Sequence, residues 1–163
     1  VFDCAQLVGE TVSRVITSQD ARQPQQSSVD FNCNFLVGGQ IAGERQRLFL
    51  VYPEGNFIEA TADTPYFQIG ESKYGKPVID RVVTRATSLS AATKCILVSF
   101  DSTMRSNISV GLPIDLVSIE TDALRVKSQR RIDEHDPYFR MVHVQWGEGL
   151  RRVFAELPDP DWA

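Results

Sequence analysis

Polar side chains that could take part in catalysis gather in two loops of the chain. The first loop carries Glu71 and Ser72 directly after a glycine, and the second carries Ser106 and Ser109. A serine hydroxyl becomes a nucleophile when a base lies beside it. The nucleophile elbow of one hydrolase class has the pattern Gly-x-Ser-x-Gly, but here the last position is Tyr74. The pattern alone therefore favours a capped turn at Ser72 over a catalytic serine.

The first loop is predicted to lie between a strand and a helix. Apolar and polar residues alternate over Tyr66–Ile69 as in a strand, and Gly70 permits the backbone angles of a tight turn. Pro77 fits only near the start of a helix, where no hydrogen-bonded N–H is needed. A helix reaching about Val83 should follow, so the polar pair would be held at the end of a sheet.

The second loop is predicted to follow another helix. Ser88 or Ser90 would cap this helix, which runs to about Arg105, and a strand over Ile114–Glu120 comes next. Serine and asparagine side chains at such a connection commonly bond the local backbone. Loop geometry is thus a sufficient explanation for the two serines when the pattern is taken alone.

The rest of the chain predicts two more helices and an antiparallel sheet. The helices are expected from Phe2 to about Thr17 and from Asp136-Pro137 to the Pro158 tail. The further strands are expected at Phe31–Ala42, Arg47–Tyr52 and Phe57–Ala60, with a loop over Gln19–Ser28 and an exposed, charged segment over Thr121–Asp136. This order favours an α+β fold in a single domain spanning residues 1–163.

Composition limits the classes of partner. The 163 residues are 42% hydrophobic and carry a net charge of −4, which is typical of a globular protein and not of a nucleic-acid binder, although Arg125–Arg131 could form a local basic patch. Cys4, Cys33 and Cys95 are widely spaced along the chain. None of them is separated from a histidine by the number of residues that is typical of a zinc site. We therefore expect a cytoplasmic protein without disulfides, metal or cofactor, and the sequence shows neither a bilayer-spanning run nor a signal peptide.

Two runs together resemble the bacterial proteasome-related peptidases called Anbu. They are Tyr66–Arg81 and Cys95–Leu116, and the similarity extends from Val1 to about Val126. These peptidases are N-terminal-nucleophile hydrolases, like proteasome β-subunits. The resemblance implies a four-layer αββα sandwich, in which two antiparallel sheets lie between outer helices, and this chain would lack the first strands.

The resemblance also implies a reaction. In this family the hydroxyl of an N-terminal threonine attacks the amide, and the α-amine of the same residue acts as the base. An early lysine lowers the hydroxyl pKa, and an early aspartate holds that lysine. Val1 has no hydroxyl, and the chain would start after all three residues. We therefore expect the C-terminal portion of a threonine peptidase, which holds only the shell that supports the nucleophile.

The family motifs indicate which residues would form that shell. The Gly-Ser-Gly turn of proteasome β-subunits matches the first loop, so the polar group near the nucleophile would come from Glu71 or Ser72. The Asp-x-x-Ser pair that bonds the terminal amine matches Ser106-x-x-Ser109, with serine in place of aspartate. Asp101 lies about a turn earlier and could take the place of that aspartate.

The partners that the resemblance implies are a protein or peptide substrate and further copies of the chain. Tyr74 and Val83, or the last helix, offer apolar candidate contacts, and an open sheet edge would also favour self-association. A non-catalytic scaffold like proteasome α-subunits is the alternative function, and a small-molecule amidase is a third. No nucleic acid or membrane partner is expected, and the sequence does not indicate whether an ATPase partner exists.

Overall fold

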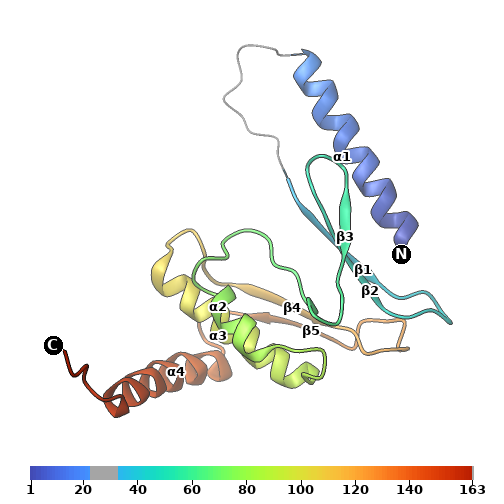
Figure 1. The fold of residues 1–163 in the computed structure, drawn as a ribbon. Helices are drawn as coiled ribbons and strands as arrows, with labels where there is room; N and C mark the ends of the chain where they lie inside the picture. The colour runs from blue at the N-terminus through green and yellow to red at the C-terminus, as the bar shows by residue number, and fades with distance from the viewer. Residues whose placement is uncertain (23–32, 163) are drawn as a thin grey trace. The chain divides into compact units, whose positions relative to one another are not determined.

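Four α-helices and five β-strands form in residues 1–22 and 33–162, which the computed structural model describes (Figure 1). The helices are α1 (Phe2–Arg22), α2 (Lys76–Val82), α3 (Leu89–Ser106) and α4 (Pro137–Glu156). The strands are β1 (Phe35–Gly39), β2 (Arg47–Val51), β3 (Phe57–Glu59), β4 (Ile114–Ser118) and β5 (Ser128–Ile132). The fold class is therefore α+β, as predicted. The chain divides into two compact units, one made of residues 1–70 with 119–127 and the other of residues 71–118 with 128 onward.

The first unit is an antiparallel sheet in the order β1-β2-β3 with α1 lying along it (Figure 1). Its core is formed by Ala5 of α1 with Phe49 and Val51 of β2, all less than 2% exposed. The helix approaches the β2–β3 turn closely at Gly9, where an added Cβ would lie 3.1 Å from the carbonyl carbon of Gly55. Gly55 itself has a φ of +90°, which glycine adopts without strain.

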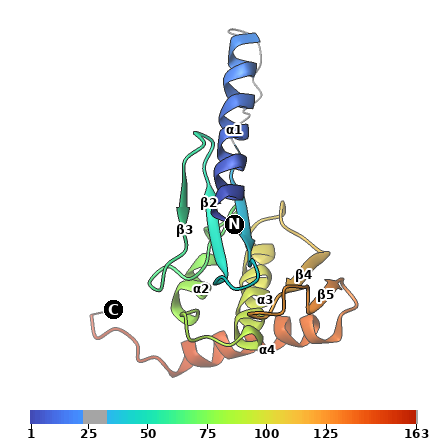
Figure 2. The same cartoon turned by 90° about the vertical axis from the view of Figure 1, so that its right-hand side faces the viewer.

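The second unit packs α3 and α4 with the antiparallel pair of β4 and β5 (Figure 2). Each of these four elements contributes one residue to the core: Leu97, Ile114, Ile132 and Phe139. The helix α2 packs against α3 in the same unit. The helix α3 therefore contacts both other helices of this unit, and its C-terminal end leads into the second of the two polar loops.

Local sequence signals predicted the starts of two helices correctly. Ser88 precedes α3, and its hydroxyl accepts a 3.3 Å hydrogen bond from the Ala91 N–H. Asp136 precedes α4, and its carboxylate accepts a 2.9 Å bond from the Phe139 N–H, while Pro137 occupies the first turn. Both predictions are confirmed. Helix caps can be predicted from the sequence because they depend only on residues that are close together along the chain.

The strand predicted over Tyr66–Ile69 is wrong. The backbone there has no strand assignment and joins neither sheet of the described chain. The side chains of residues 66–68 are half-buried, whereas Ile69 is 45% exposed. Alternation of apolar residues specifies two faces, but a strand also needs a neighbour that accepts its backbone hydrogen bonds.

The strand β5 lies inside the segment that was predicted only as exposed and charged. Its residues 128–131 are exposed and polar, so it carries no apolar alternation, and only Ile132 is buried. Its register against β4 pairs Ile132 with Ile114. One buried residue and a full ladder with β4 define this strand, and neither is visible as a sequence pattern.

The first helix and the first strand differ in length from the predictions. The helix α1 continues to Arg22, past the predicted end near Thr17, so the predicted loop over Gln19–Ser28 begins later. The remainder of that loop lies outside the described residues. The strand predicted over Phe31–Ala42 is present as β1, and its first two predicted residues also lie outside the described chain.

Candidate functional site

Asn107 joins the two polar loops. Its amide Nδ2 donates a 2.8 Å hydrogen bond to Oε2 of Glu71 in the first loop. Its carbonyl Oδ1 accepts a 2.8 Å bond from the backbone N–H of Ser109 in the second loop. One side chain therefore holds a carboxylate from the first loop against the backbone of the second.

The end of α3 fixes the position of Asn107. Its N–H donates to the Thr103 carbonyl at 2.8 Å, which closes the last turn of the helix, and its own carbonyl accepts from the Val110 N–H at 3.2 Å. The bond to Ser109 makes an Asx turn, a geometry that asparagine forms readily after a helix. The backbone around Asn107 is thus ordered by local bonds, and the side chain is oriented by them.

Close packing of α2 on α3 holds the first loop. Gly75 is buried directly before α2, and a Cβ there would lie 2.7 Å from Oγ1 of Thr103 and closer still to Oγ of Ser99. Such distances leave no room for any other side chain. The glycine that falls one place too late for a nucleophile elbow therefore has a packing role, and it anchors the run that begins at Glu71.

Glu71 is held as a carboxylate. The Lys73 N–H donates a 2.7 Å bond to its Oε1, and this bond, the Asn107 amide and the Lys73 charge lower the pKa of Glu71, while burial acts against them. Hydrogen bonds to the charged form of an acid favour that form. Glu71 is therefore an acceptor at neutral pH, suited to binding a cationic group rather than to donating a proton.

The structure places the predicted site residues differently. Glu71 and Ser109 are linked through Asn107, which donates to the Glu71 carboxylate and accepts the backbone N–H of Ser109. Ser109 itself is exposed. Ser106 is exposed at the last position of α3. Ser72 does not cap α2, because Gly75 is the residue before the helix and no side chain caps it. The Ser72 carbonyl instead accepts a 3.3 Å bond from the Lys76 N–H.

Two further polar residues have roles that the sequence motifs did not indicate. Asn107 was predicted only as a residue suited to a loop, and its bond to Glu71 joins positions 36 residues apart. Asp101, considered as the replacement for the missing aspartate, has a partner on α4: its Oδ1 lies 2.5 Å from Nδ1 of His143. Asp101 is 7% exposed, so this partner compensates a buried carboxylate.

Several other kinds of site find no support in the described chain. No group of three His, Cys, Asp or Glu residues there could hold a metal ion. None of the described helices combines the length and hydrophobicity needed to cross a membrane. The basic run is largely paired with acids: Lys127 with Glu120, Arg130 with Asp136, and Arg131 with Asp115.

Comparison with known proteins yields matches among solved structures only. No protein-family model and no curated protein sequence matches the chain. Anbu (ancestral β-subunit) from Yersinia bercovieri is 54% identical over 98% of this chain and 65% of its own, with a TM-score of 0.89. The Anbu (Gly-1) mutant from Hyphomicrobium sp. strain MC1 is 48% identical over 99% of this chain and 66% of its own, with a TM-score of 0.88.

A third match is the helical assembly of the Anbu complex from Pseudomonas aeruginosa, with 46% identity over 98% of this chain and a TM-score of 0.86. The chain spans 65–66% of the length of these three relatives. These alignments extend over nearly the whole chain, so they include residues of both units of the fold. The chain belongs to the Anbu family of proteasome-related, β-subunit-like proteins.

Proposed function

We propose that this chain is part of a threonine-type peptidase of the proteasome class and forms the shell that supports its N-terminal threonine. The attacking threonine, with its lysine and aspartate, would come from outside these 163 residues, since the relatives are longer than this chain. The observation that carries the proposal is the bond between Asn107 and Glu71. It joins the two loops that match the two motifs placed near the nucleophile in proteasome β-subunits.

The proposed reaction is hydrolysis of an amide bond through an ester. The threonine hydroxyl attacks the amide carbon, and the α-amine of the same residue takes up the hydroxyl proton. That proton passes to the departing amine, and water then cleaves the ester. An ammonium forms during the first step, and the ionised Glu71, held by Asn107 and the Lys73 N–H, supplies an acceptor of opposite charge.

Glu71 rather than Ser72 is the residue that we assign to this role. The notable difference between the two is that Glu71 is bonded to the second loop, while the Ser72 carbonyl is engaged in the start of α2. Ser109 would contribute its backbone position through Asn107. Ser106, which is exposed at the end of α3, would have the smallest part.

The proposal includes the architecture and the assembly of the protein. TM-scores of 0.86–0.89 over nearly the whole chain support a single domain that belongs to a four-layer αββα sandwich. The relative from Pseudomonas aeruginosa is described as a helical assembly, so we infer that this protein also associates with copies of itself. Its substrate would be a protein or peptide.

The test is hydrolysis by the full-length protein. Peptide amides and small acyl amides would be compared as substrates, with the N-terminal threonine intact and replaced by alanine. The proposal predicts cleavage of peptides that the replacement abolishes. Cleavage of the small amides alone would indicate an amidase, and a protein inactive on both sets would be a non-catalytic scaffold. Activity that survives the threonine replacement would contradict the proposed nucleophile.

A further inference from the structure

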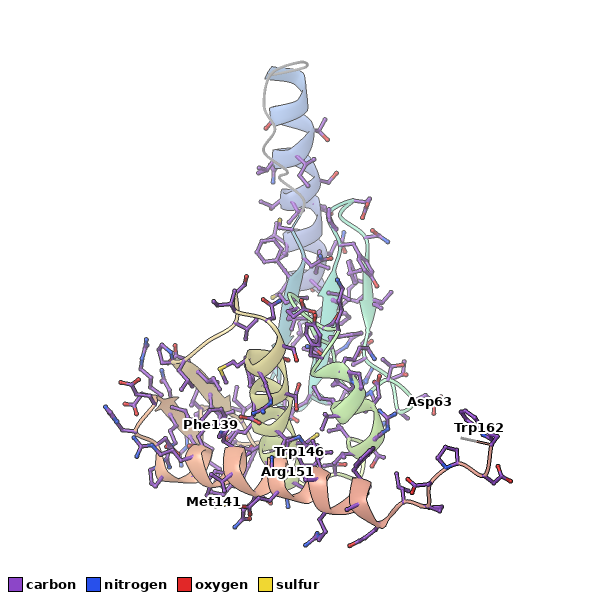
Figure 3. All side chains as sticks on the ribbon, turned by 90° about the vertical axis from the view of Figure 1, so that its left-hand side faces the viewer. Asp63, Phe139, Met141, Trp146, Arg151 and Trp162 are labelled. Carbon is purple, nitrogen blue, oxygen red and sulfur yellow. The ribbon has the colours of Figure 1, made fainter. Side chains whose placement is uncertain are left out.

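Ile108 is the most exposed of the large apolar side chains in the described part of the chain. Its exposed fraction is 102%, so the side chain makes almost no contact with the described residues. The next most exposed, Trp162 at 84%, lies in the tail that follows α4 (Figure 3). Ile108 instead lies between α3 and β4, in the second of the two polar loops.

The turn that carries Ile108 holds it in place. The carbonyl of Asn107 accepts a 3.2 Å hydrogen bond from the Val110 N–H, which closes a β-turn with Ile108 at its second position. The side-chain Oδ1 of Asn107 accepts a second bond, of 2.8 Å, from the Ser109 N–H. Both bonds span Ile108, so its backbone is fixed. Because isoleucine is branched at Cβ, the side chain also has few rotamers.

The turn itself does not require an isoleucine. Turns favour Gly, Pro, Asn, Asp and Ser, each for a reason that concerns the backbone, and Ser109 at the next position is of this kind. Isoleucine offers no hydrogen bond, and its burial from water is favourable. A single exposed apolar side chain is common on protein surfaces, so the location of Ile108 decides what it implies.

That location is beside the candidate site. Ile108 follows Asn107 directly, so the two Cα atoms are about 3.8 Å apart. Asn107 holds the carboxylate of Glu71 at 2.8 Å, and this carboxylate is proposed above to lie beside the reacting threonine. An extended peptide advances about 3.3–3.4 Å per residue. A substrate side chain within two residues of the cleaved bond, about 7 Å along the peptide, is therefore close enough to contact Ile108.

We propose that Ile108 contacts the peptide substrate and favours peptides with an apolar side chain within two residues of the cleaved bond. The inference rests on the proposed function and adds the class of substrate to it. An apolar substrate side chain is expected because isoleucine has no polar atom or charge, so only the removal of apolar surface from water stabilises the contact. The competing occupants are another part of the longer protein and a second copy of it.

The test measures peptide hydrolysis by the full-length protein and its Ile108→Ala variant. Two peptides are compared that differ only in carrying leucine or alanine at one position next to the cleaved bond. The parent should prefer the leucine peptide by at least about 10-fold in kcat/KM. Ile108→Ala should reduce this preference by about 5-fold or more, because two groups in direct contact are coupled. The same preference in the parent and the variant would overturn the proposal.

A matched control separates substrate contact from a structural role. Val144 is 53% exposed on α4, which contributes no residue to the two polar loops, so Val144→Ala should leave the preference unchanged. If Ile108 packed against another part of the protein or a second copy, Ile108→Ala would lower kcat/KM for both peptides by the same factor. It would also lower the thermal stability or change the mass of the assembly. That result would contradict the proposal.

Moving the leucine along the peptide locates the contact. Mass spectrometry of the products identifies the cleaved bond, and the position that is sensitive to Ile108→Ala should lie within two residues of it. Sensitivity confined to more distant positions would contradict the placement of Ile108 beside the site. A parent protein that cleaves peptides with a preference independent of Ile108 would contradict this inference only. A parent protein that cleaves no peptide would contradict the proposed function and this inference with it.

Discussion

Asn107 Nδ2 lies 2.8 Å from Glu71 Oε2, and this bond connects the end of α3 to the loop before α2. The same asparagine accepts the N–H of Ser109. Because an amide has one donor side and one acceptor side, it can serve both loops at once. The geometry of the candidate site therefore depends on Asn107 more than on either of the serines named by the family motif.

Replacing Asn107 by leucine tests this dependence. The variant keeps the branched shape of the side chain but removes the donor to Glu71 and the acceptor for Ser109. We expect kcat/KM of the full-length protein on peptides to fall by about 10- to 100-fold, since a misplaced catalytic group loses this much. Ser106→Ala, at the exposed end of α3, should retain parental activity. Equal activity of the two variants would contradict the claim that the geometry of the candidate site depends on Asn107.

Acid should weaken the fold in part through Glu71. Its pKa in the folded protein is lowered, mainly by the Lys73 N–H and also by the Asn107 amide. The stabilisation is thus fully present above the unfolded pKa of about 4.3 and is lost as the pH falls through the folded value. Denaturant unfolding from pH 7 to pH 3 should show Glu71→Gln less stable than the parent at pH 7, with the difference vanishing at low pH. A difference that does not change with pH would contradict the assignment.

Gly75 should tolerate no larger residue. A Cβ there would lie 2.7 Å from Thr103 Oγ1, so Gly75→Ala must push α2 away from α3. Overpacking of this kind costs about 1–3 kcal/mol. The matched control is Gly149→Ala, which meets nothing within 4 Å and should stabilise α4 by about 0.5–1 kcal/mol. Thermal unfolding of both variants measures the effects, and an unchanged stability of Gly75→Ala would show that the helices separate freely.

His143 should stabilise α4 through Asp101. The two side chains approach to 2.5 Å, and Asp101 is 7% exposed, so His143→Leu leaves a buried carboxylate without this partner. We expect a loss of roughly 1–3 kcal/mol in unfolding free energy. His135→Leu, at an exposed position before α4, should change stability by less than about 0.5 kcal/mol. Similar effects of the two histidine variants would contradict a specific role of the pair.

Features set by neighbouring residues could be predicted from the sequence. Ser88 and Asp136 cap α3 and α4 as expected, because a cap requires only a polar side chain and the first helical N–H groups. The prediction of a strand over Tyr66–Ile69 was wrong, and β5 was not predicted at all. A strand also requires a partner strand elsewhere in the chain, which a local pattern does not reveal. One buried residue in β5, Ile132, is too weak a pattern to identify it.

The site could be predicted only in outline. The family resemblance identified the two loops and left the choice between Glu71 and Ser72 open. That choice depends on bonds from Lys73 and Asn107, and the second of them spans 36 residues. No spacing rule relates two loops at such a separation, because their contact depends on how α2 packs against α3. The small volume of Gly75, which permits this packing, has no sequence signature of its own.

The most direct test of the central claim is the rate of peptide cleavage by the full-length protein carrying Glu71→Gln, compared with Ser72→Ala. Glutamine keeps the shape of Glu71 but removes the negative charge proposed to hold the terminal ammonium. The account predicts that Glu71→Gln loses most of the activity and that Ser72→Ala retains it. Full activity of Glu71→Gln, together with loss of activity in Ser72→Ala, would contradict the account.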